Sequence, residues 1–292
     1  MSILIKLFNW KLFGGLFLGW GVGANDSANV FGTAVATNSV RYRTAVILIA
    51  IFVILGSCIH GRHLFEELNF KSQNNNNQST AITNPIDKNK ENTKAFVSTL
   101  AAAVTVLIAT ALGIPASTSQ AAIGAMLGIS ISEALAITGP VDWAHLADWS
   151  KFGKMLICWV INPIGSAIIS ILLYKILFFF IQLFFKKNLS KLNQIYRILL
   201  LIAGSYGAYE LGANNVVITT APFYTSGMFG DLNINHQHFW NDPAFIAALI
   251  GSLSIAVGAL TYSKKVMYTV GSSITALDPF SALEQFFRIL SV

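Results

Sequence analysis

The sequence predicts an all-α protein, specifically a polytopic transmembrane helix bundle with inverted repeats and with discontinuous or re-entrant helices. Three observations predict this fold. Of the 292 residues, 54% are hydrophobic and only 11% are charged, whereas an ordinary soluble domain carries about 25% charged residues. The apolar residues gather in long runs that polar segments separate. A short polar motif also occurs twice, and the loops beyond its two copies carry opposite charge bias.

The apolar runs are candidate membrane helices, because a helix that crosses the bilayer needs about 20 largely apolar residues. In chain order they cover residues 8–22, 44–59, 95–112, 121–137, 155–185, 198–209, 244–262 and 266–277. Several are shorter than a full span, and short segments interrupted by glycine are typical of discontinuous membrane helices. The run 155–185 is too long for a simple crossing, and we expect Pro163 to kink it.

Two segments are expected outside the lipid. Residues 61–94 have mixed charge and no apolar periodicity, which predicts a flexible extramembrane loop. Residues 186–197 carry four basic residues and no acidic one, so the positive-inside rule places them in the cytoplasm. The formal net charge of the chain is +6. Because its basic residues cluster at the ends of apolar runs, membrane topology explains this charge, and we set nucleic-acid binding aside.

A four-residue motif near the start of the chain recurs in its second half. Gly23-Ala24-Asn25-Asp26 is followed, 189 residues later, by Gly212-Ala213-Asn214-Asn215. Beyond the first copy lies the basic segment 41–43, whereas the loop 231–242 beyond the second copy has no lysine or arginine. Opposite charge bias at equivalent positions predicts inverted topology. We therefore expect a first inverted repeat, 1–185, which contains the loop 61–94, and a second, incomplete one, 186–292.

The residues of the first motif suit a site for a small cation. Glycine and alanine beside Asn25 and Asp26 allow the backbone either to pack closely or to unwind where it lines a cavity. Carbonyl and carboxylate oxygens are hard ligands for a small cation. Because a carboxylate in lipid costs roughly 2.5–3.5 kcal/mol on the insertion scale, we expect Asp26 to face a partner. The alternative is that these small residues merely let two helices touch.

A second polar cluster covers residues 113–120. Pro115 blocks helix continuation from the preceding run and suits the start of a new helix. Ser117, Thr118 and Ser119 then place hydroxyl groups beside the unpaired N–H groups of that helix start. Hydroxyls both donate and accept, so they can bind the oxygens of an anion or a dehydrated cation. The alternative is an ordinary Ser/Thr helix cap.

At these residues the chain resembles the inorganic phosphate transporter (Pit) family, secondary transporters built from two inverted repeats. The family signature resembles GANDxxNA near the start of each repeat, with P-x-S-T-S-[HQ] later in each. The chain matches the first signature at residues 23–29 and the serine-rich motif at 115–120. It matches the second copy of the signature only in part, at 212–214.

The resemblance implies a site, a function and a location. The substrate-binding residues would be Asn25, Asn29, Ser117, Thr118, Ser119, Gln120, Asn214 and Asn215, and the ligands of Na+, if transport is sodium-coupled, would be Asp26, Asn25 and Asn214. The implied function is symport of inorganic phosphate with Na+ or H+, with no enzyme activity, no catalytic residue and no resident cofactor. The chain would be a multi-pass protein of the plasma membrane, the inner membrane in a Gram-negative bacterium. A homodimer embedded in the lipid bilayer is one candidate assembly.

Two departures from the family pattern leave alternatives open. Asn215 stands where an aspartate is common, and Ile218 where the last asparagine would be, so one negative charge is lost and the number or identity of the coupling cations should change. Glu210 either replaces that charge or lies at the membrane interface. An asparagine in this place also resembles the sulfate-permease relatives of the family. Sulfate is therefore the alternative substrate.

The second departure concerns the end of the chain. Adding 189 to 115 and 120 places the second serine-rich motif near residues 304–309, whereas the chain ends at Val292. We therefore expect a truncated second repeat. A non-transporting membrane remnant, or a chain that pairs with another polypeptide, is the alternative that this departure leaves open.

Overall fold

The computed structural model describes residues 9–65, 85–136, 149–185, 189–229 and 242–273, which form helices and short connections without a β-strand. Its α-helices are α2 (Leu12–Ala36), α3 (Tyr42–Gly56), α5 (Pro85–Leu112), α6 (Thr118–Ala136), α7 (Trp149–Phe185), α8 (Leu189–Thr225), α9 (Pro243–Tyr262) and α10 (Lys264–Tyr268). Two π-helical segments cover Ser57–Gly61 and Thr269–Ser273. The predicted all-α fold is confirmed.

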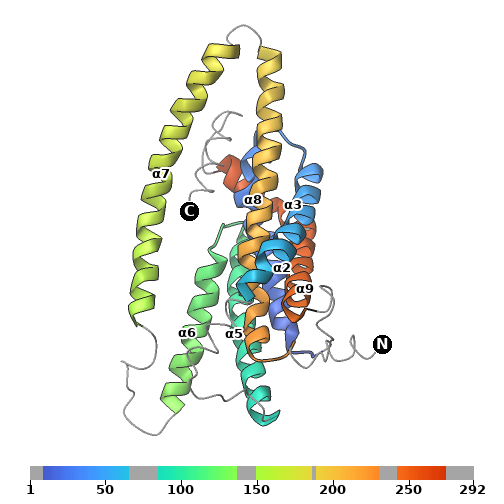
Figure 1. Cartoon of the computed structure of the whole chain (residues 1–292), viewed down its shortest axis with the longest axis vertical. Coiled ribbons are helices and arrows are strands. Elements are labelled where there is room, and N and C mark those ends of the chain that lie inside the picture. The colour runs from blue at the N-terminus through green and yellow to red at the C-terminus, as the bar shows by residue number, and fades with distance from the viewer. Residues whose placement is uncertain (1–8, 66–84, 137–148, 186–188, 230–241, 274–292) are drawn as a thin grey trace.

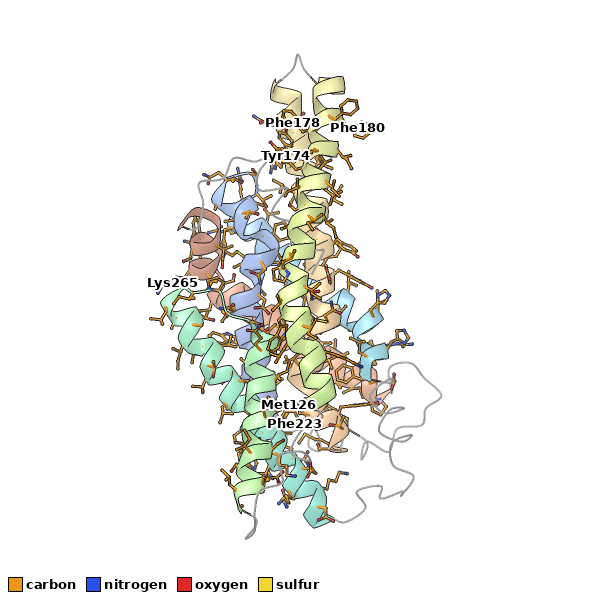
Figure 2. All side chains as sticks on the ribbon, turned by 90° about the vertical axis from the view of Figure 1, so that its left-hand side faces the viewer. Met126, Tyr174, Phe178, Phe180, Phe223 and Lys265 are labelled. Carbon is orange, nitrogen blue, oxygen red and sulfur yellow. The ribbon has the colours of Figure 1, made fainter. Side chains whose placement is uncertain are left out.

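Several stretches of these helices can cross a membrane. Among the described residues, five are long and apolar enough: Tyr42–Phe65, Asp87–Leu112, Thr118–Ala136, Gly153–Phe180 and Pro243–Tyr262. Helix α7 exposes large apolar side chains along much of its length, and Figure 2 shows Tyr174, Phe178 and Phe180 on its upper part. A helix that is apolar all round and not covered by protein is typical of a membrane span. The predicted transmembrane bundle is therefore confirmed.

Some predicted boundaries are wrong. The run 8–22 is expected to end before the first motif, but α2 continues through the motif to Ala36. The predicted loop 186–197 is helical from Leu189, and the short run 198–209 lies inside the same helix, α8. Apolar runs report contact with lipid or core, whereas lysine, glutamine and leucine are good helix formers that allow a helix to extend beyond the end of an apolar run.

The predicted loop 61–94 and the last predicted run also differ from the structure. The loop is helical to Phe65 and again from Pro85, because proline suits the first helical turn. The run 266–277 is divided between α10 and the π-helical segment Thr269–Ser273, and the rest of it lies outside the described residues. The second-copy loop 231–242, on which the expected inversion partly depends, also lies outside them except for Asp242.

Helix α2 is the central element and packs against α5, α8, α9 and α10 (Figure 1). Its glycines allow backbone contact with α9. A Cβ atom at Gly23 would collide with the carbonyl oxygen of Ile255, and one at Gly258 would collide with the carbonyl oxygen of Trp20. The first motif therefore packs closely within a continuous helix and is not unwound.

The second motif makes the same kind of contact with α3. A Cβ atom at Gly212 would collide with the carbonyl oxygen of Val53, and one at Gly56 would collide with the carbonyl oxygen of Tyr209. The residues of this contact match those of the α2–α9 contact one for one. In the motif helices, Gly212 and Tyr209 follow Gly23 and Trp20 by 189 residues. In the partner helices, Ile255 and Gly258 follow Val53 and Gly56 by 202 residues. The two copies of the motif thus occupy equivalent packing environments.

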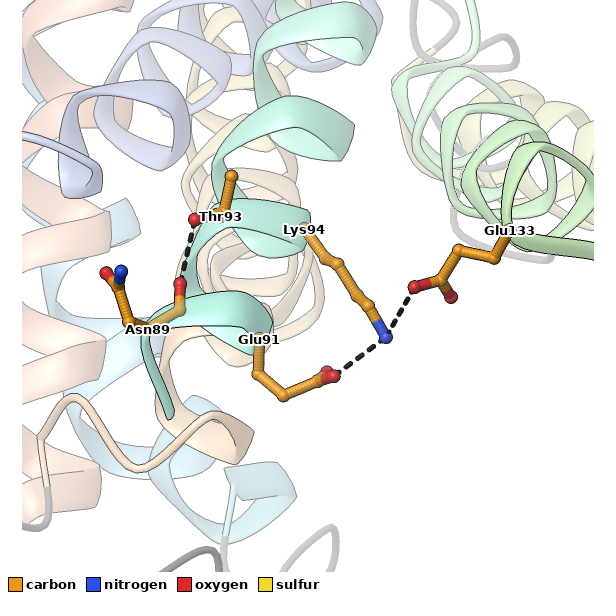
Figure 3. Close-up of polar contacts among 5 residues, drawn as sticks. All are labelled: Asn89, Glu91, Thr93, Lys94 and Glu133. Atoms are coloured by element: carbon orange, nitrogen blue, oxygen red, sulfur yellow. Dashed lines mark hydrogen bonds and ion pairs between the residues drawn. The ribbon is translucent and has the colours of Figure 1, made fainter. Parts of the chain in front are cut away.

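Helices α5 and α6 form a hairpin whose turn, residues 113–117, lies near mid-height of the molecule (Figure 1). Lys94 joins the two helices well away from that turn. Its ammonium group lies 2.7 Å from a carboxylate oxygen of Glu91 in α5 and 2.8 Å from one of Glu133 in α6 (Figure 3). The ion pairs of Lys94 thus join α5 and α6 at the end of the hairpin that lies away from the turn, and the turn itself lies in the middle of the bundle. Helix α7 stands to one side (Figure 1).

Candidate functional site

The turn of the hairpin is built by a glycine that ends α5. Gly113 has a φ of +77°, the left-handed conformation that often ends a helix and that glycine adopts without steric cost. Its N–H donates to the Thr110 carbonyl over 3.0 Å, and the N–H of Ile114 donates to the Ala109 carbonyl over 2.9 Å. These two bonds form a Schellman motif, which stops the helix. Pro115 follows, and α6 begins at Thr118.

Asn25 of α2 fixes this turn in place. Its side-chain oxygen accepts from the N–H of Ala116 over 2.9 Å, and its amide nitrogen donates to the Ile114 carbonyl over 3.1 Å and to the Thr110 hydroxyl over 3.0 Å. Asn25 is fully buried. Every polar group of its side chain is therefore used within the protein, so Asn25 supports the turn from behind.

Asp26 lies where three helices meet. One of its carboxylate oxygens, Oδ2, accepts from the hydroxyl of Thr118 in α6 over 2.7 Å and from the amide of Asn215 in α8 over 3.1 Å. Within the part of the chain that the structure describes, the other oxygen, Oδ1, has no hydrogen-bond partner. The side chain is only 5% exposed. Asp26 and Asn215 occupy the same place in the two motif copies, so equivalent residues of the repeat contact each other.

A polar cavity of about 330 Å³ opens beside this carboxylate. Its lining residues are Asp26, Asn29, Pro115, Ala116, Ser117, Thr118, Ser119 and Asn215. Six of the nine residues predicted for the site are among them, namely Asp26, Asn29, Ser117, Thr118, Ser119 and Asn215. Residues that lie about 90 and 190 positions apart in the sequence thus line one cavity.

The structure places the other three predicted residues outside the lining. Asn25 lies behind the hairpin turn, whereas Gln120 and Asn214 are exposed. Asn214 and Asn215 are neighbours on a continuous helix, where each residue is turned by about 100° from the last, so only one of them can face Asp26. Pro115 and Ala116 also line the cavity, although neither is among the residues predicted for the site. Their position between the preceding helix and the serine-rich residues is the feature from which this could have been predicted.

The N-terminus of α6 gives the cavity an anion-binding wall. Ser117 is the N-cap residue, because its hydroxyl oxygen accepts from the N–H of Gln120 over 3.3 Å. The first N–H groups of a helix lack intrahelical partners and carry partial positive charge. The hydroxyls of Ser117 and Ser119 stand beside them. The arrangement can bind an oxyanion. The carboxylate of Asp26, which the hydroxyl of Thr118 joins to the same helix start, is available to a small cation or a proton.

A comparison with known families identifies the family of this chain. Residues 22–286, most of the chain, match the model of the phosphate transporter family. The chain belongs to the phosphate transporter family. The predicted resemblance is confirmed, and both motifs that carry it lie inside the matched range. With the spans described above, this member of the family is a multi-pass membrane protein.

Individual relatives cover much of the same length. A Pyrococcus furiosus protein named "putative phosphate permease" is 25% identical over 90% of this chain and 75% of its own length. The chloroplastic inorganic phosphate transporter of Arabidopsis thaliana is 31% identical over 60% of this chain and 28% of its own length.

A solved structure supports the fold of this family member. A structure titled as the sodium-dependent phosphate transporter aligns with 99% of the chain and 84% of that structure, with a TM-score of 0.68 and 19% sequence identity. The overall fold of the chain therefore resembles that of a solved structure.

Proposed function

We propose that this chain carries inorganic phosphate across the plasma membrane by symport with a cation, either Na+ or H+. The observation that carries the proposal is the cavity that Asp26 and the N-terminus of α6 share. Membership of the phosphate transporter family supports it. The argument has two parts, one for the anion and one for the cation.

Phosphate would bind at the hairpin. The N–H groups of the first turn of α6 and the hydroxyls of Ser117 and Ser119 are donors that match the oxygens of a tetrahedral oxyanion. Asn29, which is exposed in the cavity from α2, adds an amide. The cavity of about 330 Å³ is large enough for phosphate with part of its hydration shell, so binding does not require complete dehydration.

The cation would bind at Asp26. Its Oδ2 is occupied by Thr118 and Asn215, so Oδ1 is the oxygen available to Na+ or H+. A bare carboxylate repels an anion in the same cavity, and a cation or proton on the carboxylate removes that repulsion. Binding of one species therefore raises the affinity for the other, by equal factors. This linkage is what symport needs, because the carrier then favours the empty and the doubly loaded states.

Sulfate is the second candidate, because Asn215 leaves the cavity with a single carboxylate and its donors suit any tetrahedral oxyanion. One property separates the two anions. Hydrogen phosphate carries a proton that it can donate to an amide oxygen of the lining, such as that of Asn29, whereas sulfate at neutral pH has none to donate. A hydrogen-bond acceptor in the lining therefore favours phosphate.

Uptake by lipid vesicles that contain only this chain tests the proposal. Labelled phosphate should accumulate when an inward Na+ or H+ gradient is imposed, and unlabelled sulfate in excess should not compete. Accumulation of labelled sulfate that phosphate does not inhibit would assign the second candidate. Accumulation of neither anion would indicate that the chain does not transport on its own.

A further inference from the structure

A second contact holds the turn of the hairpin, and it comes from α10. The ammonium group of Lys265 donates to the carbonyl oxygen of Ala111 over 2.5 Å. Ala111 lies in the last turn of α5, where carbonyls lack intrahelical partners. Because the Schellman motif already satisfies the carbonyls of Ala109 and Thr110, Lys265 binds the next carbonyl along the chain.

The stem of Lys265 also packs against the turn. A Cβ atom at Gly113 would lie 3.2 Å from Cε of Lys265 and 3.2 Å from the hydroxyl of Thr269. Figure 2 shows Lys265 beside the end of α5. Among the described residues, no carboxylate pairs with its ammonium group. Its positive charge thus faces the negative end of the α5 dipole, which is a favourable position for a cation.

We infer that Lys265 is a positioning residue for the oxyanion-binding turn, an inference that rests on the proposed function. Asn25 holds the turn at Ile114 and Ala116, and Lys265 holds the end of α5 at Ala111, just before the turn, so two separate elements fix its position. The N-terminus of α6, which supplies the anion donors, begins directly after this turn.

The contact also joins the two halves of the chain. Lys265 lies in α10, which follows α9 after one residue and packs against α2. The hairpin belongs to the first half of the chain. A shift of α9 and α10 relative to α2 therefore changes the support of the anion-binding turn without any contact between Lys265 and the anion.

Transport kinetics give the first test. Lys265→Met keeps the stem and removes the charge and the donor, and a lost hydrogen bond to a charged donor should raise the KM for phosphate about tenfold. Lys264→Met is the matched control, because Lys264 is the exposed neighbour without this contact. Lys265→Arg should restore a KM near that of the wild type, since a guanidinium also donates to a carbonyl.

Two kinetic results would overturn the inference. One is an unchanged KM in Lys265→Met. The other is a fall in Vmax that matches a loss of folded protein while KM stays constant, because a merely structural lysine acts in that way.

A second test does not depend on transport. In a chain with Cys58→Ala and Cys158→Ala, the change Ile114→Cys places a thiol on the turn, where Ile114 is 52% exposed. If Lys265 holds the turn, reaction of this thiol with a water-soluble maleimide should be several-fold faster with Lys265→Met and unchanged with Lys264→Met. Equal rates in all three proteins would contradict the positioning role. Faster labelling in a chain that takes up no phosphate would keep the positioning role and refute the proposed function instead.

Discussion

The two carboxylate oxygens of Asp26 have different environments. Its Oδ2 ties together α2, α6 and α8 through Thr118 and Asn215, while no described residue binds its Oδ1. An acid that is 5% exposed in a membrane protein is costly unless its charge is compensated. The hydrogen bonds on Oδ2 compensate part of this cost, and a coupling cation or proton on Oδ1 would compensate the rest.

Replacing this acid should uncouple the cation from the anion. Asp26→Asn keeps the size of the side chain and removes its charge. The loss of a charged interaction worth roughly 3 kcal/mol should lower cation-dependent phosphate uptake by about two orders of magnitude or more. Uptake by vesicles with and without the cation gradient measures this. Asp87→Asn, an exposed acid at the start of α5, is the control and should behave as the wild type. Unchanged cation dependence in Asp26→Asn would refute the role assigned to Asp26.

Ser117 can be tested for two roles at once, because it caps α6 and also lines the cavity. Ser117→Ala removes the hydroxyl and the cap, with a cost in stability of about 1 kcal/mol, whereas glycine at an N-cap costs only about a few tenths. If the hydroxyl binds the anion, Ser117→Ala and Ser117→Gly should raise the KM for phosphate by similar factors. If only Ser117→Ala has an effect, and that effect is on thermal stability in detergent, Ser117 is a cap alone.

At the scale of helices, close backbone contact decides where the site residues point. The paired glycine contacts of α2 with α9 and of α8 with α3 fix how each motif helix is rotated. Asp26 and Asn215 then face one another, while Asn25 faces the hairpin turn and Asn214 faces outward. A motif helix that could rotate would present a different member of its asparagine and aspartate residues to the cavity.

A methyl group at one of these contacts should be strongly destabilising. Gly212→Ala places a Cβ atom against the carbonyl oxygen of Val53, with no space to accept it, and should cost about 1–3 kcal/mol of stability, as overpacking does. Gly124→Ala in α6 is the matched control, since no other atom lies within 4 Å of the Cβ position there. Alanine at that site should be neutral or stabilising by about 0.5–1 kcal/mol. Thermal unfolding in detergent compares the two, and equal melting temperatures would contradict the packing account.

At the scale of the whole molecule, the sequence was informative where chemistry is local and uninformative where packing decides. Composition predicted the membrane bundle, and the polar motifs predicted most of the cavity lining. The choice between Asn214 and Asn215 depends on the rotation of α8, which no pattern in the motif reveals. The contact of Lys265 joins residues 154 positions apart and has no sequence signal. The inversion of the two halves and the division at residue 185 stay predictions.

The central claim is that one cavity binds both phosphate and the coupling cation, so that their affinities are linked. The most direct test is the dissociation constant of phosphate for the purified chain in detergent, measured by calorimetry while Na+ concentration and pH are varied separately. The account predicts that phosphate binds more tightly as either Na+ or H+ increases, and that this dependence disappears in Asp26→Asn. A phosphate affinity that is independent of both ions would contradict it.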